Sequence, residues 1–193
     1  MYIAPPIFMF FISEGFVYTR DRKKYIIRLL IVGVVTQFAF VLGNAGAMDW
    51  YMFSHSGNVI LTLLISLLIL MIYESKLNVF LRAILALALI GFTYLWKMEW
   101  GVVAPLVVFS FYAFRNKPVW RFVIYDLIMV GYTVISMGMN VPFLLVVQIP
   151  IIMVTFFYNG KKGRFPRFSR NFFYIFYPAH MLFIFLIKVL FKA

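Results

Sequence analysis

The chain has 193 residues, of which 65% are hydrophobic, 21% aromatic and 12% charged. Soluble globular domains are about half apolar and about a quarter charged, so this chain cannot bury its apolar surface in one soluble core. We therefore predict an integral membrane protein. The formal net charge is +12, but the basic residues lie in short clusters between apolar segments, where membrane topology and anionic lipids explain them. We expect no nucleic-acid partner.

The composition also excludes several kinds of site. The chain has no cysteine and two histidines, so it can form no disulfide or thiolate site, and we expect no metal. Residues 1–11 lack the basic start and the small-residue cleavage site of a signal peptide. We expect them to belong to the first spanning helix.

Apolar runs alternate with short polar links along the chain. A helix needs about 20 residues to cross the hydrocarbon layer, with roughly 17 as a lower limit. We predict an all-α transmembrane bundle of about eight helices in a single domain, residues 1–193. The predicted spans are residues 3–19, 25–43, 58–74, 79–96, 100–115, 121–138, 141–158 and 171–190.

The basic residues lie mainly in alternate links. Most of the 18 Lys and Arg residues fall in or beside the first, third, fifth and seventh links between the predicted helices. Cytoplasmic links of membrane proteins carry an excess of Lys and Arg. We therefore predict that the odd-numbered links are cytoplasmic and that both termini lie outside.

Three ionisable residues, Glu14, Asp126 and His180, lie within predicted spans. Each costs roughly 2.5–3.5 kcal/mol in hydrocarbon, so each is a candidate for function. Their distances along the chain from the basic links place all three roughly 8–15 Å from the cytoplasmic face. We predict that His180 is a catalytic general base and that Glu14 is the carboxylate that orients it. Asp126 is expected to be a structural acid.

Structural alternatives exist for both catalytic candidates. In one, His180 only hydrogen-bonds a backbone carbonyl that Pro178 leaves free. In another, Glu14 pairs with Arg20 or Arg28 by extending toward the interface. Spacing along the chain does not decide between these interpretations and the catalytic one.

Two basic links on the predicted cytoplasmic face could hold the phosphates of a nucleotide-like donor such as coenzyme A. In the link from Tyr158 to Arg170, glycines allow close approach of the backbone to a ligand, and adjacent basic side chains can clamp phosphates. The predicted donor-binding residues are Arg20, Arg22, Arg28, Asn159, Lys161, Lys162 and Arg164. Topological bias and binding of lipid headgroups are an equally good explanation of these charges.

The longest outer link, residues 43–58, combines small and aromatic residues and suits a membrane interface. Its residues His55 and Asn58 lie where an external acceptor would arrive. We predict that they bind the acceptor substrate, although a histidine in such a link is more often simply solvated.

Four segments resemble, in order and spacing, the TraX family of bacterial membrane proteins. They are PPIFMFFISEGFVYTRDRKKYIIRLL (5–30), GNVILTLLISLLI (57–69), YNGKKGR (158–164) and FFYIFYPAHMLFIFLIK (172–188). The combination is more specific than any one segment. Carried over by position, the pattern of the family falls on Glu14, Gly15, Thr19, Arg20, Arg28, Asn58, Thr62, Asn159, Gly160, Tyr177, Pro178 and His180. Tyr177 is accordingly added to the predicted substrate-binding residues.

The resemblance implies a multi-helix acyltransferase of the bacterial inner membrane that uses cytoplasmic acetyl-CoA as donor. The founding member is associated with acetylation of the pilin amino terminus, so a pilin or peptide amine is one expected acceptor and a glycan hydroxyl another. Family members usually have an upstream helix with an Asp-His pair, and this sequence begins after that helix. The alternative is a non-catalytic membrane protein or a small proton-coupled transporter in which Glu14 and His180 relay protons.

Overall fold

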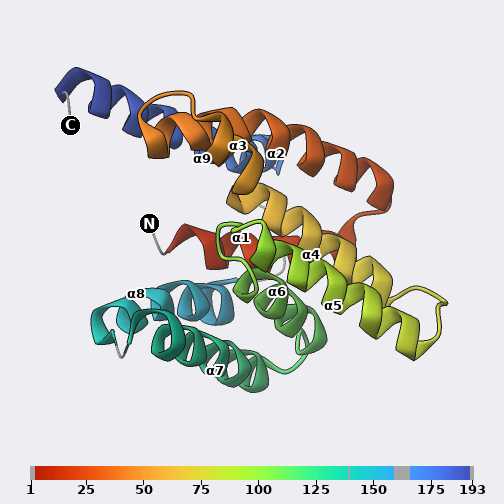
Figure 1. The fold of residues 1–193 in the computed structure, drawn as a ribbon. Coiled ribbons are helices and arrows are strands. Elements are labelled where there is room, and N and C mark those ends of the chain that lie inside the picture. The colour runs from red at the N-terminus through yellow and green to blue at the C-terminus, as the bar shows by residue number, and fades with distance from the viewer. Residues whose placement is uncertain (1–2, 139, 159–165, 192–193) are drawn as a thin grey trace.

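The computed structural model describes residues 3–138, 140–158 and 166–191, and every regular element within these ranges is a helix (Figure 1). In chain order they are α1 (Ala4–Tyr18), α2 (Arg22–Ala45), α3 (Trp50–His55), α4 (Val59–Tyr73), α5 (Val79–Leu95), α6 (Val103–Ala113), α7 (Pro118–Met137), α8 (Val141–Ile152), a π-helix (Met153–Phe157) and α9 (Pro166–Phe191). The predicted all-α fold is confirmed.

Each predicted span corresponds to an apolar helix, and α8 and the π-helix together form the span at 141–158. Among the described residues, three helical segments are long and apolar enough to cross a membrane, namely 22–45, 118–136 and 174–191. The remaining apolar helices have 10–17 residues. Of the eight predicted spanning helices, three are therefore long enough to cross the membrane by the length criterion, and the others are shorter apolar helices. The six-residue helix α3, inside the outer link, was not predicted.

Polar side chains in the links explain where several helices begin. Asp21, Asn58, Asn78 and Asn140 each accept a hydrogen bond from a backbone N–H in the first turn of α2, α4, α5 and α8. These caps satisfy N–H groups that have no partner within the helix. Gly46 ends α2 with φ 74°, a left-handed conformation that glycine adopts without strain.

Helix α4 lies at the centre of the bundle. It packs against α1, α2, α5 and α6, and most of its side chains are buried, including Leu67 and Leu70. A helix that is apolar on all sides suits such a position. Helix α9 packs along α2, whereas α7 and α8 pack together on the far side of α6 (Figure 1).

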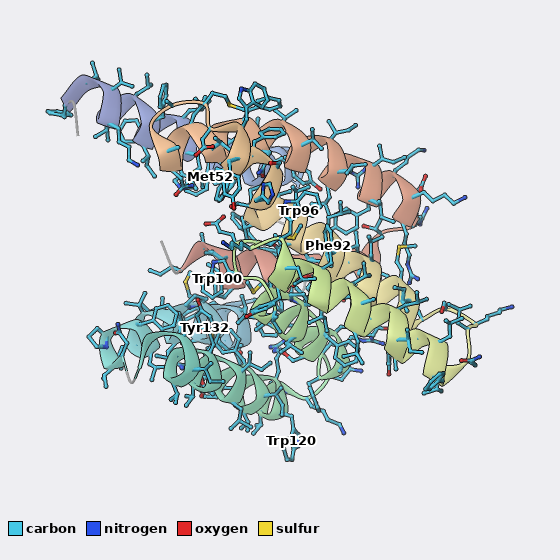
Figure 2. All side chains as sticks on the ribbon, viewed as in Figure 1. Met52, Phe92, Trp96, Trp100, Trp120 and Tyr132 are labelled. Atoms are coloured by element: carbon cyan, nitrogen blue, oxygen red, sulfur yellow. The ribbon has the colours of Figure 1, made fainter. Side chains whose placement is uncertain are left out.

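The outer surface of the bundle is apolar. Helices α5, α7 and α9 expose large hydrophobic side chains such as Phe80, Ile135 and Leu190, and Trp120 projects away from α7 (Figure 2). An apolar surface of this extent needs a lipid bilayer to cover it. The molecule is a membrane protein.

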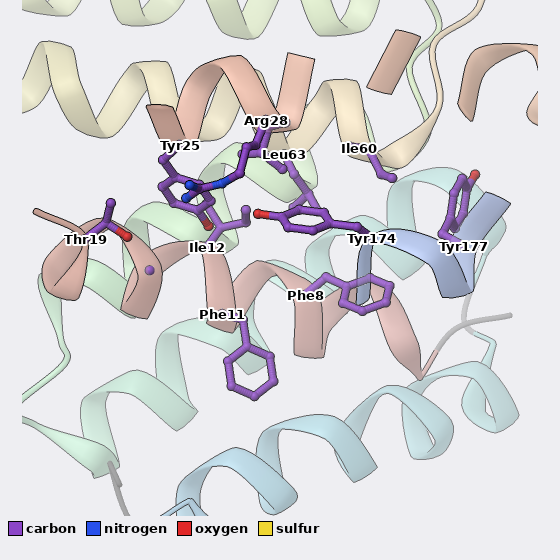
Figure 3. A pocket seen from close by; sticks show the side chains of 12 residues that line it. Phe8, Phe11, Ile12, Thr19, Tyr25, Arg28, Ile60, Leu63, Tyr174 and Tyr177 are labelled. Atoms are coloured by element: carbon purple, nitrogen blue, oxygen red, sulfur yellow. The ribbon is translucent and has the colours of Figure 1, made fainter. Parts of the chain in front are cut away.

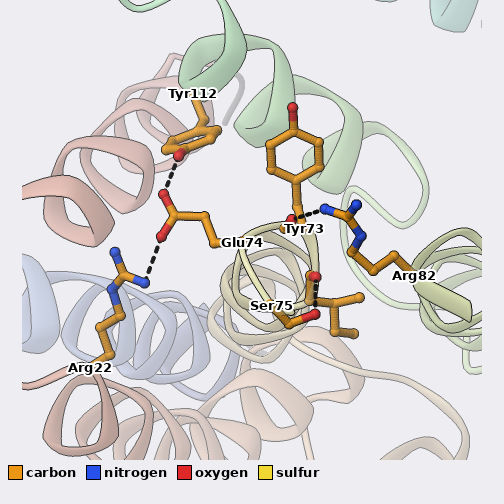
Figure 4. Close-up of polar contacts among 7 residues, drawn as sticks. Arg22, Tyr73, Glu74, Ser75, Arg82 and Tyr112 are labelled. Atoms are coloured by element: carbon orange, nitrogen blue, oxygen red, sulfur yellow. Dashed lines mark hydrogen bonds and ion pairs between the residues drawn. The ribbon is translucent and has the colours of Figure 1, made fainter. Parts of the chain in front are cut away.

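Links that are far apart in sequence meet at one end of the bundle. There, Glu74 of the third link forms a 2.7 Å ion pair with Arg22 and accepts a hydrogen bond from the hydroxyl of Tyr112 (Figure 4). The guanidinium of Arg115, in the fifth link, lies 5.0 Å from the centre of the Tyr112 ring. The first, third and fifth links therefore share one end, as the distribution of basic residues predicted. The assignment of that end to the cytoplasm stays a prediction.

Candidate active site

A cavity of about 310 Å³ lies between α1, α2, α4 and α9 (Figure 3). Its walls are mostly apolar or aromatic, with Arg28 as the charged residue among them. The residues that line it are Phe8, Phe11, Ile12, Gly15, Thr19, Tyr25, Arg28, Leu29, Ile60, Leu63, Tyr174 and Tyr177. A largely apolar cavity with a few polar groups is the usual form of a small-molecule site.

One face of α1 forms a wall of this cavity. Phe8, Phe11, Ile12 and Gly15 line it, and a spacing of three or four residues brings such positions to the same side of a helix. Gly15 is the place of closest approach, because an added Cβ would lie 2.7 Å from the hydroxyl oxygen of Tyr25. The absence of a side chain at this position lets the Tyr25 phenol reach the cavity wall.

Arg28 lies at the same end of the cavity as Thr19 and Tyr25 (Figure 3). Its guanidinium is 5.8 Å from the centre of the Tyr25 ring. The Arg28 Nε is shielded and has no hydrogen-bond partner among the described residues. A guanidinium with unused donors in an apolar cavity is a strong binding group for an anion, phosphate above all.

Tyr177 and Ile60 line the cavity at its other end (Figure 3). The hydroxyl of Tyr177 donates a hydrogen bond to Oε2 of Glu99, which lies in the link between α5 and α6. The same oxygen accepts a 3.1 Å hydrogen bond from the backbone N–H of Val59, at the first turn of α4. Burial raises the pKa of the Glu99 carboxyl, and the hydrogen bonds from Tyr177 and Val59 oppose this shift. Glu99 is therefore a buried acid whose charged form is disfavoured by loss of solvent and supported by two hydrogen bonds.

The backbone around Glu99 is strained. Lys97 and Trp100 have φ values of 45° and 61°, in the left-handed region that residues other than glycine rarely adopt. The backbone N–H of Glu99 donates a 2.8 Å hydrogen bond to the carbonyl of Gly57, and a Cβ on Gly57 would lie 2.7 Å from Cγ of Met98. Strained backbone of this kind tends to occur at functional sites.

His180 lies one helical turn beyond Tyr177 on α9. The centres of the two rings are 5.2 Å apart, and the imidazole also stacks on Phe176 at 5.7 Å. His180 Nδ1 has no hydrogen-bond partner in the described part of the chain, so the structure does not support the alternative in which this nitrogen binds a carbonyl freed by Pro178. A charged His180 would stabilise the ionised form of Glu99. Glu99 is therefore linked to His180 through Tyr177, which binds the carboxylate with its hydroxyl and packs its ring against the imidazole.

Glu14 occupies a different environment. Its Oε2 accepts a 3.1 Å hydrogen bond from the hydroxyl of Tyr158, and its charge acts on Arg121 of α7. Within the described residues it has no hydrogen bond or ion pair with His180, Arg20 or Arg28. The expected hydrogen bond or ion pair between Glu14 and His180 is therefore not formed in the described part of the chain.

Comparisons with known proteins identify the family of this chain. The family model described as TraX protein matches residues 2–188. The chain belongs to the TraX family. It is also 33% identical over 189 residues to a probable fimbrial assembly protein FimC, serogroup H1, from Dichelobacter nodosus, covering 91% of this chain and 76% of that protein. No solved structure gives a significant match.

Several positions of the TraX pattern meet at the cavity. Gly15, Thr19, Arg28 and Tyr177 all line it, although they come from α1, the first link, α2 and α9. The predictions that Arg28 binds the donor and that Tyr177 binds substrate stay predictions, and the cavity gives them a common location.

The other predicted donor residues are placed differently. Arg20 is exposed, and Arg22 is held by its ion pair with Glu74 and by the Phe16 ring, 4.0 Å from its guanidinium carbon. Arg22 therefore has a structural partner that sequence reasoning did not anticipate. The remaining predicted donor residues, Asn159, Lys161, Lys162 and Arg164, lie outside the described residues.

Asn58 is fully buried, which corrects the expectation that it meets an external acceptor. Its Nδ2 donates 2.8 Å hydrogen bonds to the carbonyl of Gly33 and to Oε1 of Gln37. Its Oδ1 accepts hydrogen bonds from the N–H groups of Ile60 and Leu61 at the start of α4. All the hydrogen-bonding capacity of this amide is used within the protein. Asn58 joins α2 to α4 and fixes the start of the central helix.

His55 is exposed at the end of α3. Its ring stacks on Tyr51 with the ring centres 4.3 Å apart, and Nδ1 lies 2.8 Å from the hydroxyl oxygen of Ser54. It remains accessible, so its proposed contact with an acceptor stays open to test.

Sequence reasoning missed Glu99. The chain has only six acidic residues, and Glu99 stands between Met98 and Trp100 in a short link. An acid flanked by large apolar residues in a mostly apolar link is the signal in the sequence that marks this position. The link is short and lies between predicted spans, so the cost of burying a charge in hydrocarbon does not point to Glu99 as it does to Glu14, Asp126 and His180.

Proposed function

We propose that this protein is a membrane-embedded acyltransferase that moves an acetyl group from cytoplasmic acetyl-CoA to an acceptor at or across the membrane. The observation that carries the proposal is the cavity itself, which has an unpartnered arginine at one end and Tyr177 at the other, next to His180. Such a cavity offers separate places for a charged carrier and for a reacting group.

The donor would enter from the end of the cavity that holds Thr19 and Arg28. Arg28 would bind a phosphate oxygen of coenzyme A, because its Nε has no partner in the described protein. The apolar walls, among them Phe8, Phe11 and Leu63, would enclose the thioester arm. Exclusion of water from such a cavity would limit hydrolysis of the thioester.

His180 would act as the general base at the other end. It would take the proton from an acceptor hydroxyl or amine while the acceptor oxygen or nitrogen attacks the thioester carbonyl carbon. The carbon–sulfur bond then breaks, and the coenzyme A thiolate leaves with the proton that His180 received. The reaction gives one acetylated acceptor and one free thiol, and it restores the neutral imidazole.

A fimbrial subunit is the acceptor that the comparisons support best. The similarity to a probable fimbrial assembly protein covers most of this chain. An amine or hydroxyl of such a subunit would supply the nucleophile. His55, exposed at the end of α3, would contact an acceptor that approaches from the outer side.

The test is transfer of isotope label from acetyl-CoA by purified protein in liposomes, with a cell-surface fraction that contains fimbrial subunits as acceptor. We expect labelled acceptor only when protein and fraction are both present. His180→Ala should lower the rate about 10²- to 10⁴-fold. Phe183→Ala is the matched control, because Phe183 is exposed on the same helix. Absence of label with the wild type would contradict the proposal, and substrate-dependent proton movement without label would favour the transporter alternative.

A further inference from the structure

We infer that Glu99 is the positioning residue of His180, the role that sequence reasoning gave to Glu14. The inference deepens the proposed function and, for its activity readout, rests on it. It starts from the contact between the Tyr177 hydroxyl and Glu99 and from the packing of the Tyr177 ring against His180.

Glu99 is held from several directions. Its side chain accepts hydrogen bonds from Tyr177 and from the N–H of Val59, and its backbone binds Gly57 and Thr62. The Thr62 hydroxyl donates a 2.8 Å hydrogen bond to the Glu99 carbonyl. A carboxylate fixed in this way can in turn fix the side chains that bind it.

Tyr177 connects Glu99 to His180. The two residues are three apart on α9, so their side chains are neighbours on one side of the helix. The Tyr177 ring is held at its hydroxyl by Glu99 and meets the imidazole at its edge, with an angle of 66° between the ring planes. The charge of Glu99 also lies close enough to interact with a charged imidazole. Glu99 thus restricts the orientation of His180 and would stabilise the imidazolium that forms during transfer.

The other acids of the chain are engaged elsewhere. The chain has six acidic residues, and all of them lie in the described part. Asp21 and Asp49 cap α2 and α3, and Glu74 pairs with Arg22. Asp126 lies near Gln148 of α8, and its Oδ1 has no hydrogen-bond partner in the described residues. Glu14 binds Tyr158. Glu99 is the acid that contacts bring to His180, because it binds the Tyr177 hydroxyl and the Tyr177 ring packs against the imidazole.

The first test needs no enzymatic activity. Protein labelled with ¹³C in the histidine rings has two imidazoles, and a His180→Gln variant identifies which NMR signal belongs to His180. We expect Glu99→Gln and Tyr177→Phe each to shift the His180 signal while the His55 signal stays in place. Glu14→Gln and Glu74→Gln should leave both signals unchanged. A His180 signal that is unmoved in Glu99→Gln, or that moves in Glu14→Gln, would overturn the inference.

Glu99→Asp keeps the inference testable if Glu99→Gln fails to fold. The shorter carboxylate retains the charge and moves the oxygens by about one bond length, so we expect a smaller shift of the His180 signal than Glu99→Gln would give. Helical circular dichroism and an unchanged His55 signal show that a variant is folded. A His180 signal identical to that of the wild type in a folded Glu99→Asp variant would count against the role.

The second test uses transfer of labelled acetyl. We expect Glu99→Gln to lower kcat about 100-fold with KM for acetyl-CoA within about twofold, because a positioning residue acts on the transition state, and Glu99→Asp to recover part of the rate. Full activity in Glu99→Gln would overturn the inference. If the wild type transfers no label, the proposed function fails, and the NMR result still decides whether Glu99 positions His180.

Discussion

Two tyrosine–carboxylate pairs occupy opposite ends of the bundle. Tyr112 donates its hydroxyl hydrogen to Glu74, at the end where the basic links meet, and Tyr177 donates to Glu99, at the other end of α4. The chemical groups are the same, but the surroundings differ. Glu74 has a direct ion pair with Arg22 at 2.7 Å, whereas Glu99 has no ion pair with lysine or arginine in the described residues.

The pKa values of Glu74 and Glu99 shift in opposite directions because Glu99 is buried whereas Glu74 is partly exposed and has a cation beside it. The hydrogen bond from Tyr112, followed by the contact with Arg22, lowers the pKa of Glu74. Burial raises the pKa of Glu99. A carboxylate that is paired with a cation, as Glu74 is with Arg22, serves to hold links together. A buried carboxylate with no lysine or arginine partner is suited to stabilise a positive charge that develops beside it. The comparison therefore favours a structural role for the Glu74 pair and supports the role proposed for the Glu99 pair.

The difference between the two pairs can be tested by removing the hydroxyl from each tyrosine. Tyr177→Phe should lower acetyl transfer about 100-fold, because Glu99 then loses its link to the helix that carries His180. Tyr112→Phe removes the same atom from the other pair and should leave the rate within about twofold. Both rates are measured with labelled acetyl-CoA under saturating donor. Equal losses in the two variants would show that the two ends do not differ in function.

The charged end of the cavity gives a second contrast. Arg28→Met keeps most of the side-chain volume and removes the guanidinium, so KM for acetyl-CoA should rise about 10-fold, which corresponds to loss of one charge-assisted hydrogen bond. Lys76→Met is the control, since Lys76 is an exposed cation at the same end of the bundle. Initial rates over a range of donor concentrations separate KM from kcat. A similar rise in KM for both variants would indicate general electrostatic attraction rather than a site at Arg28.

The sequence contained enough information for the fold. Hydrophobic runs placed the helices, and residues such as Asn78 and Asn140 at the polar links turned out to cap α5 and α8. The clustering of basic residues predicted that the odd links share an end, and the contact between Arg22 and Glu74 bears this out for the first and third links. These features are local or follow from the bilayer, so they can be read without knowing how the helices pack.

The site depended on contacts that the sequence does not encode locally. Glu99 and Tyr177 are 78 residues apart, and only the packing of α9 on α2, near α4, brings them together.

A third prediction concerns the structural role of the Glu74 pair. Glu74→Gln should lower the free energy of unfolding by about 1 kcal/mol at neutral pH, since the ion pair is partly exposed and contributes little beyond the hydrogen bonds. The pKa of Glu74 is below its ordinary value of 4.5, so the stabilisation is complete above that value and is lost as the pH falls through the lowered pKa. Melting temperatures of wild type and variant in detergent should therefore differ at pH 7 and converge toward acid pH. A difference that grows on acidification would contradict the assignment.

The smallest expected effect tests the cavity wall rather than its charges. In Gly15→Ala the new methyl carbon would lie 2.7 Å from the Tyr25 hydroxyl oxygen, so the phenol must move toward the space that the donor would occupy. Cζ and Cε1 of the same ring lie 3.0 and 3.1 Å from the added carbon, so the buried ring shifts as a whole. We expect KM for acetyl-CoA to rise about two- to threefold with kcat unchanged. Gly131→Ala is the matched control, since an added Cβ there meets nothing within 4 Å. If both variants leave KM unchanged while Arg28→Met raises it, the donor binds at the Arg28 end without reaching the wall formed by Gly15 and Tyr25.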